Sequence, residues 1–226
     1  MFPCHLNVKR TFVYGRTIVL YSVNMAISTR SNGIRSRQAI LDRVLEVASS
    51  AGLQAATIGV LSDALGMSKS GVFAPFGSKE ALDLAAIDAA AERFGRGVLA
   101  PAATAPPGIA RVVALCEGFL AFVMPAAGAP AHLVPEHPAF GLNASPAVRV
   151  RLDAWRTAWR DALLASVAEA ITHGEMTASS DPAQAVFELR AVLDAAARGM
   201  RDEPPAAIVA RARQAIDRAL VTWSAA

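Results

Sequence analysis

From Ser36 onward, apolar residues recur every three or four positions almost to the end of the chain, and this period constrains the fold more than any other feature. An α-helix repeats every 3.6 residues, whereas a half-buried strand alternates apolar and polar residues. No stretch alternates for long enough to demand a sheet. With 226 residues, 54% of them hydrophobic, the chain is long enough for one or two packed domains. We therefore predict an all-α protein.

Residues that cap or end helices divide this pattern into segments. Gly52 followed by Leu53 is expected to end the first helix in the left-handed conformation, and Asp181 to Gln184 is expected to form a capping box. The short helix after Ser68 is expected to turn Val72 and Phe73 toward the core. In chain order, the expected helices cover 36–51 (capped by Ser36), Thr57 to Gly66, Ser68 to Pro75, Ser78 to about Leu99, 109–124, Val148 to Gly174, Asp181 to about Met200, and Pro205 to Trp223.

Two segments between these helices are irregular. Residues 101–107 read as a proline-bearing linker, and residues 125–145 as a loop long enough to be functional. The charge-free stretch from Gly118 to Pro135 has about the length of a membrane span, but its prolines would break any helix there. We predict no membrane partner. The two cysteines, Cys4 and Cys116, are too few for a disulfide framework and are typical of a cytoplasmic protein.

Positive charge is concentrated in the first third of the chain. Residues 1–80 carry nine Lys and Arg against four Asp and Glu, a balance of +5, while residues 81–226 carry thirteen against fifteen, a balance of −2. Because cations supply affinity for phosphates by displacing counterions, this asymmetry favours a nucleic-acid contact near the amino terminus.

The first 24 residues differ in composition from the rest of the chain. They contain both tyrosines and no alanine, and Arg16 interrupts their apolar stretch, which argues against a secretory signal. We hypothesise that Met25 is the natural start. The alternative is a short strand or arm that packs on the body or reaches DNA through Lys9, Arg10 and Arg16.

Two short helices separated by a tight turn have the dimensions of a helix-turn-helix. The turn is Leu65-Gly66-Met67-Ser68, with Ser62 four residues before the glycine and Val72 six residues after it. A small side chain lets the two helices approach, glycine adopts the left-handed turn conformation, and the later apolar residue anchors the second helix. This spacing alone also occurs in unrelated helical proteins.

Three strings in the right order give the pattern its specificity. They are Ser36-Arg-Gln-Ala-Ile-Leu41, Gly66-Met-Ser-Lys-Ser-Gly-Val-Phe73 and Phe76-Gly-Ser-Lys-Glu80. Over about residues 35–85, the chain resembles the TetR/AcrR family of transcriptional regulators. Residues 1–30 are expected to be a flexible extension, and the resemblance implies a helix-turn-helix DNA-binding domain over 31–80 and a helical ligand-binding and dimerisation bundle over 81–226.

The resemblance further implies a homodimer whose two recognition helices enter successive major grooves of a double-stranded, near-palindromic DNA operator. Lys79 matches the family's phosphate-contacting lysine. Two departures stand out: Phe73 replaces a usual tyrosine, and Ala74-Pro75 replace larger residues. The implied DNA-binding residues are Thr57, Ser68, Lys69, Ser70, Gly71, Phe73, Ala74 and Lys79.

In the remaining helices, the resemblance implies a pocket for a small apolar effector and a dimer interface on the last two helices. Arg156 or Arg190 is a candidate to orient an acidic group, and ordinary bundle core is the alternative for each aromatic residue. The expected pocket residues are Phe119, Phe122, Trp155, Trp159 and Phe187, with Met124 beside them. The expected interface residues are Phe187, Ala191, Asp194, Ala195, Ile216, Leu220 and Trp223.

No catalytic or cofactor signature accompanies these features. His132 and His137 flank prolines that exclude the one-face geometry of a helical metal site, and Cys116 lies on an apolar helix typical of core. We therefore predict no catalytic residue, no metal and no cofactor. The predicted function is a ligand-responsive dimeric repressor. An activator, or an all-helical small-molecule binder or enzyme with a merely structural helix-turn-helix, are the alternatives.

Overall fold

The computed structural model describes residues 16–124, 134–135, 144–177, 181–200 and 203–224, with side chains described from residue 33 onward. Contacts divide the chain into two units, residues 1–39 and residues 40–226. The described residues are helical apart from turns and one isolated bridge between Met176 and Ser224, which confirms the all-α prediction. The helices are α1 (Arg16–Ala51), η1 (Leu53–Ala55), α2 (Ile58–Leu65), α3 (Lys69–Phe73), α4 (Lys79–Phe94), the π-helical η2 (Gly95–Leu99), α5 (Ala100–Ala102), α6 (Ile109–Val123), α7 (Pro146–Thr172), α8 (Pro182–Gly199) and α9 (Pro205–Trp223).

Helix α1 begins twenty residues before the predicted start, so Ser36 lies inside the helix and is not its N-cap. No proline occurs between Arg16 and Ser36, and a serine in a helix interior does not end the helix. Residues 16–24 are helical, which contradicts a strand in that stretch. The earlier part of the extension lies outside the described residues.

Most of the other helix ends agree with prediction. Thr57, Ser68 and Ser78 are N-caps whose hydroxyls accept backbone N–H groups three residues later, and Gly66 ends α2 with φ 61° and ψ 30°. These caps satisfy amides that the first helical turn leaves without partners. Each helix of the predicted helix-turn-helix therefore starts where its capping residue indicated.

Three local predictions were wrong. Gly52 has φ 88° and ψ 158°, which is not the left-handed helical conformation, and it leads into η1. Asp181 caps α8 by accepting from Ala183, while the Gln184 amide donates to Glu188, so no reciprocal capping box forms. The predicted single helix from Ser78 to Leu99 changes to a π-turn at Gly95. There a Cβ on Gly97 would lie 2.8 Å from the Phe122 ring, so α6 packs very close to η2.

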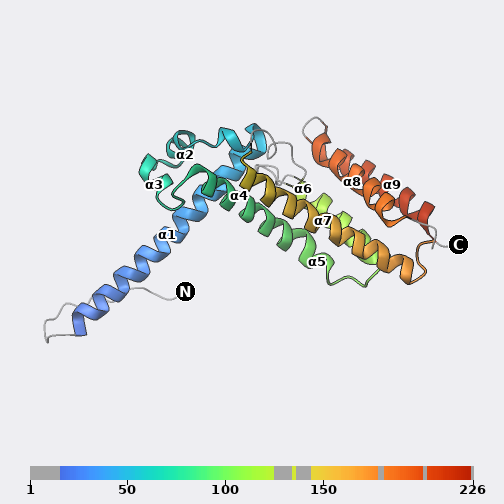
Figure 1. The fold of residues 1–226 in the computed structure, drawn as a ribbon, viewed down its shortest axis with the longest axis horizontal. Coiled ribbons are helices and arrows are strands. Elements are labelled where there is room, and N and C mark those ends of the chain that lie inside the picture. Colours follow the sequence, from blue (N-terminus) through green and yellow to red (C-terminus); the bar gives the residue numbers. More distant parts are fainter. Residues whose placement is uncertain (1–15, 125–133, 136–143, 178–180, 201–202, 225–226) are drawn as a thin grey trace. The chain divides into compact units, whose positions relative to one another are not determined.

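In the unit of residues 40–226, α4 runs beside α7, and α8 lies beside α9 (Figure 1). One hydrophobic cluster extends from the helix-turn-helix into the helical body. Its members include Ile40, Leu61, Val72, Leu82, Phe94 and Leu120, all at most 2% exposed. Because α4 contributes Leu82 near its start and Phe94 at its end, this helix joins the two parts of the core.

Candidate nucleic-acid interface

The turn between α2 and α3 is closed by hydrogen bonds around Ser62. The Met67 N–H donates to the Ser62 carbonyl at 3.1 Å, and the Ser62 hydroxyl donates to the Met67 carbonyl at 2.7 Å. Sequence reasoning assigned Ser62 only the role of a small residue. In the structure Ser62 is buried, and its hydroxyl also satisfies a carbonyl of the turn. Val72, fully buried, anchors α3 as predicted.

Hydroxyls at the helix starts bind backbone amides of the same helices. Thr57 Oγ1 accepts from Val60 N at 3.2 Å, and Ser68 Oγ accepts from Gly71 N at 3.1 Å. The Ser70 hydroxyl lies 3.1 Å from the Ser68 hydroxyl. These contacts fix the first turn of each helix and give all three hydroxyls a partner within the protein.

The solvent-facing side of α3 carries most of the predicted recognition residues. Lys69, Ser70, Phe73 and Ala74 are exposed, and Gly71 is half-buried. A Cβ added at Gly71 would lie 3.2 Å from Ser68 Oγ, which is a tight contact. Phe73 is 41% exposed and does not join Val72 in the core, contrary to the predicted apolar side. Phe76, three residues later, packs partly against the core instead.

Lys79 is already bound to two acceptors of the protein. Its ammonium donates to Asp83 Oδ1 at 2.5 Å and to the Leu53 carbonyl at 3.2 Å, so it ties the start of α4 to η1. Burial raises the pKa of the Asp83 carboxyl, and the hydrogen bond and charge of Lys79 oppose that rise. Sequence reasoning missed Asp83, although the i,i+4 spacing of a lysine and an aspartate was the available signal.

Polar contacts fasten α4 to both of its neighbours. The Ser145 hydroxyl, at the cap of α7, donates to Glu80, and Arg151 pairs with Asp88 at 2.9 Å. On the other side, Arg93 pairs with Asp42 of α1. Helix α4 is therefore held along its length, from the residue after Lys79 to its last turn.

Four of the five predicted pocket residues come together around the end of α4. The Phe94 ring meets those of Phe119, Phe122, Trp155 and Trp159 edge-to-face at centroid distances of 6.1, 5.4, 5.9 and 5.2 Å. We call these five residues the aromatic cluster. Phe94 itself was missed, although it falls on the apolar stripe of the predicted fourth helix. Phe187 lies elsewhere, 67% exposed on α8, because its position in that helix faces away from the core.

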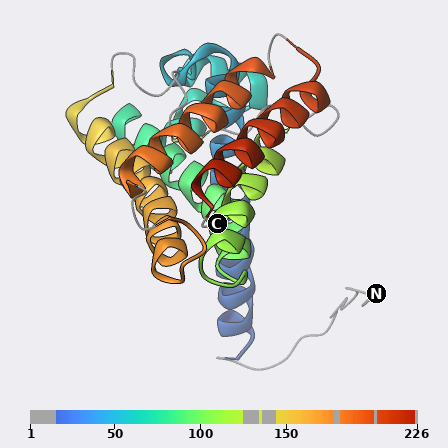
Figure 2. The same ribbon diagram turned by 90° about the vertical axis from the view of Figure 1, so that its right-hand side faces the viewer.

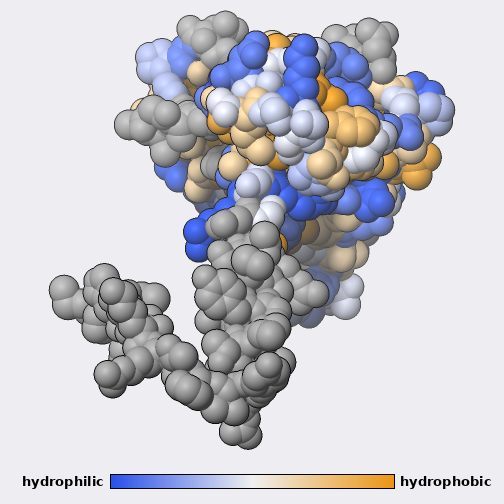
Figure 3. Space-filling model, turned by 90° about the vertical axis from the view of Figure 1, so that its left-hand side faces the viewer, coloured by the Kyte–Doolittle hydropathy of each residue, from blue (hydrophilic) through white to orange (hydrophobic). Residues whose placement is uncertain are grey.

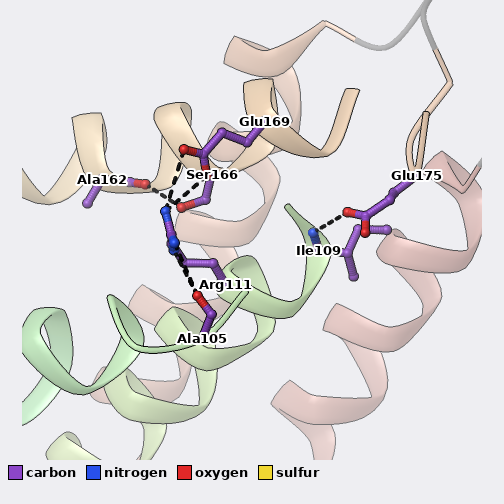
Figure 4. Close-up of polar contacts among 7 residues, drawn as sticks. All are labelled: Ala105, Ile109, Arg111, Ala162, Ser166, Glu169 and Glu175. Atoms are coloured by element: carbon purple, nitrogen blue, oxygen red, sulfur yellow. Dashed lines mark hydrogen bonds and ion pairs between the residues drawn. The ribbon is translucent and has the colours of Figure 1, made fainter. Parts of the chain in front are cut away.

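The start of α6 is held by carboxylates from the other end of α7 (Figure 4). Glu175 accepts from the Ile109 N–H at 2.7 Å, and Arg111 bonds the Ala105 carbonyl and Glu169, each at 3.1 Å. Gly108 has φ 97°, and a Cβ there would lie 2.1 Å from a Glu175 oxygen. No sequence pattern indicated this anchor, because the residues come from separate helices.

Helices α8 and α9 lie side by side (Figure 2), and both carry exposed apolar side chains. Phe187, Ala191, Ala195 and Val221 are exposed, and an open apolar groove of about 270 Å³ lies between the two helices. Ile216 and Leu220, predicted for the interface, are instead 4% and 8% exposed, and they pack in the core of the same chain. Asp194 and Trp223 are half-buried.

The other candidate groups have local roles or lie outside the described residues. Arg156 donates to the Pro135 carbonyl at 3.1 Å and pairs with Asp153, and Arg190 is half-buried on α8. Cys116 is 1% exposed in the hydrophobic cluster, which confirms the prediction of a core cysteine, and this burial raises the pKa of its thiol to about 12. His132 and His137 fall in the part that is not described.

Among the described side chains, no three His, Cys, Asp or Glu residues gather as a metal site would require. None of the described helices has both the length and the apolar character of a membrane span.

Comparison with known proteins identifies both the carboxy-terminal part and the fold. Residues 141–216 match the family model described as "Tetracyclin repressor-like, C-terminal domain". A TetR transcriptional regulator from Chloroflexus aurantiacus J-10-FL superposes with a TM-score of 0.69 at 20% identity, over 84% of this chain and 95% of that one. No curated protein matches the chain.

Two similar structures were solved with DNA. CifR, a TetR family transcriptional regulator studied as a cysteine mutant with 26-bp operator DNA, has a TM-score of 0.68 at 24% identity, over 82% of this chain and 95% of that one. AibR, in complex with isovaleryl coenzyme A and operator DNA, has a TM-score of 0.65 at 16% identity, over 84% and 98%. At these identities the likeness establishes the fold.

Proposed function

We propose that the chain is a TetR-family transcriptional regulator, and more specifically a ligand-responsive dimeric repressor that binds a near-palindromic DNA operator; the family model over residues 141–216 and the shared fold support this proposal. The observation that carries this proposal is the closed helix-turn-helix, in which the Ser62 hydrogen bonds and Val72 fix α3 while Lys69 and Ser70 stay exposed. In a symmetric dimer, two such helices enter successive major grooves about 34 Å apart.

Phosphate contacts would position the protein on the duplex. An ammonium group has three N–H donors, and Lys79 uses two of them within the protein, so one remains for a phosphate oxygen. Thr57 lies at the start of α2, where the helix dipole and the free amides favour an anion. Ser68 and Gly71 would approach the backbone through the first turn of α3.

The outer face of α8 and α9 would be the dimer interface. Phe187 and Val221, 67% and 76% exposed, are large apolar side chains that gain from burial. Ala191 and Ala195, one and two turns after Phe187 on α8, are small exposed residues that would let a second pair of helices approach closely, and a twofold axis through this face would produce a four-helix bundle.

The aromatic cluster would receive a small apolar effector. Its residues come from α4, α6 and α7, and its central ring, Phe94, is the last residue of the helix that begins at Lys79. An effector that binds one arrangement of these rings better than another shifts the population of α4 positions, and hence the spacing of the two DNA-binding heads. Arg190 is a candidate for orienting an acidic group of the effector.

Titration of the purified chain against its own upstream intergenic DNA, monitored by fluorescence anisotropy, tests the proposal. We expect saturable binding of a fragment with an inverted repeat, with two chains per fragment, at concentrations where a scrambled fragment of equal length does not bind. Equal affinity for both fragments, or a monomer by light scattering, would contradict it. The rival function, a helical small-molecule binder or enzyme with a structural helix-turn-helix, predicts no DNA binding.

We propose that this regulator acts in the cytoplasm. Fluorescence microscopy of a tagged chain, with signal over the nucleoid, checks the location. A chromatin pull-down followed by transcript measurement in a deletion strain distinguishes a repressor from an activator, because only loss of a repressor raises the transcript of its bound promoter.

A further inference from the structure

The exposed side of α3 consists of two rows of residues spaced four apart. One row pairs Lys69 with Phe73, and the other pairs Ser70 with Ala74, and all four side chains are exposed. Residues at i and i+4 are neighbours on a helix surface. Both rows therefore begin with a polar residue and end with an apolar one, which divides the surface of this short helix into a polar half and an apolar half.

The apolar half is held in a fixed position. The N–H groups of Phe76 and Gly77 both donate to the Phe73 carbonyl at 3.0 Å, and Gly77 takes φ 76° to close the turn. Ala74 caps α3, with its N–H bonded to the Ser70 carbonyl at 2.8 Å. Backbone hydrogen bonds at the Phe73 carbonyl and the Ala74 N–H therefore hold this turn, and the side chains of both residues are exposed.

Phe73 is one of several exposed large apolar side chains among the described residues, and it is the one that lies on α3. An aromatic ring 41% exposed gains free energy if a partner covers it, yet its own helix supplies no cover. The lysine in the same row argues for a partner that combines negative charge with apolar groups. The face of the unit of residues 40–226 that Figure 3 shows has apolar residues intermixed with hydrophilic ones. It is not a continuous hydrophilic surface.

The DNA major groove offers one apolar group, the C5 methyl of thymine, beside its phosphates and hydrogen-bonding edges. Alanine and phenylalanine contact that methyl, whereas neither forms a side-chain hydrogen bond with a base edge. Resting on the DNA-binding function proposed above, we infer that Phe73 and Ala74 determine specificity by covering thymine methyl groups in each operator half-site.

The spacing along α3 places these thymines relative to the other contacts. Four residues of helix correspond to a rise of about 6 Å, close to two base-pair steps of about 3.4 Å each. For a recognition helix that lies along the DNA axis, the thymines under Phe73 and Ala74 would be at most about two base pairs from the pairs approached by Lys69 and Ser70. The half-site is expected to carry T·A or A·T pairs at adjacent positions there, on either strand.

Deoxyuridine substitution tests this inference, since it removes the thymine methyl and leaves every hydrogen bond of the pair. The bound half-site is first defined by selection of random duplexes with the full chain, and each thymine is then replaced in turn. Removal of one covered methyl is expected to lower affinity about fourfold. Thymines of the same fragment outside the protected region serve as controls, with affinity unchanged.

Protein variants connect the methyl effect to the named side chains. In Phe73→Ala and in Ala74→Gly, deoxyuridine at the thymine that the altered side chain covers is expected to lower DNA affinity less than twofold. Phe73→Leu keeps the apolar contact, so its affinity should still fall about fourfold on the same substitution. Circular dichroism melting checks that the variants fold, as expected for exposed positions.

The inference is overturned if the unmodified half-site binds tightly and every deoxyuridine version binds equally well. It is also overturned if the variants keep the full sensitivity. Absence of binding to any selected duplex would instead overturn the proposed DNA-binding function, so the two failures are distinguishable.

Discussion

The Lys79 ammonium forms an ion pair with the Asp83 carboxylate one helical turn away, and Asp83 is only 4% exposed. The same ammonium reaches the Leu53 carbonyl in η1. Lys79, which the family resemblance assigns to phosphate contact, thus also joins the start of α4 to η1 within the DNA-binding part of the chain. Its two roles predict different consequences for two sets of variants.

Lys79→Ala should destabilise the protein and weaken DNA binding. Removal of the ammonium leaves a buried carboxylate without its cation, which costs about 1–3 kcal/mol in the free energy of unfolding. In the double variant Lys79→Ala with Asp83→Ala, the free energy of unfolding should largely return to that of the natural chain. The slope of log DNA affinity against log salt concentration should remain flatter than in the natural chain, by about one for each phosphate that the variant no longer neutralises. Urea unfolding and salt titration measure the two effects. An unchanged salt slope in the double variant would contradict the phosphate contact.

Asp83 should make the stability depend on pH. Its pKa in the folded state is raised above its ordinary value of 3.8 by burial, so the folded chain holds a proton that the unfolded chain has already released. Between the two pKa values, the free energy of unfolding therefore falls as pH rises, and the contribution of Asp83 is constant above the raised pKa. Urea unfolding across this acidic range should show the fall in the natural chain and not in Asp83→Asn. Parallel curves for the two proteins would contradict it.

Ser62→Ala should loosen the turn of the helix-turn-helix. The variant leaves the Met67 carbonyl without the hydroxyl that donates to it at 2.7 Å, a loss of about 1–2 kcal/mol in the free energy of unfolding. Ser50→Ala is a matched control, because its hydroxyl bonds Val47 within α1 at an exposed position. Thermal unfolding should lower Tm for Ser62→Ala alone. Equal Tm values would show that the hydroxyl contributes nothing.

Phe187→Asp should convert the proposed dimer to a folded monomer. The substitution places a charge on the outer face of α8, where the proposed interface would bury it without a partner. Val150, 70% exposed on α7, supplies the control, since Val150→Asp adds the same charge on another helix. Light scattering after gel filtration should give half the mass for Phe187→Asp and an unchanged mass for Val150→Asp. A dimer in both variants would place the interface elsewhere.

The sequence predicted best where one residue determines a local geometry. Thr57, Ser68 and Ser78 cap helices through their own hydroxyls, and Gly66 turns the chain through its own backbone, so neighbouring residues are enough to identify them. The prediction that Ser36 caps the first helix was wrong because serine also occurs inside helices. Without a proline in the preceding stretch, no local signal distinguished a capping serine from an interior one.

Contacts between distant segments were not predictable in the same way. Glu175 caps α6 from 66 residues away, and no period or motif links it to Ile109. The aromatic residues could be identified as a group, but the central position of Phe94 depends on how α4, α6 and α7 cross. Phe187 is an aromatic residue of the kind that lines apolar pockets. Its 67% exposure follows from the orientation of α8 about its axis, which the sequence does not reveal.

The length of α4 means that a small rotation of this helix at the aromatic cluster produces a larger displacement at its other end, next to the helix-turn-helix. Lys79 and Phe94 stand at opposite ends of this helix, which is about 22 Å long at 1.5 Å per residue. A tilt of about 5° about Phe94 would then move the Lys79 end by about 2 Å, more than half of one base-pair step. In the dimer proposed above, an effector that displaced one of these rings would therefore shift both helix-turn-helix units relative to the operator.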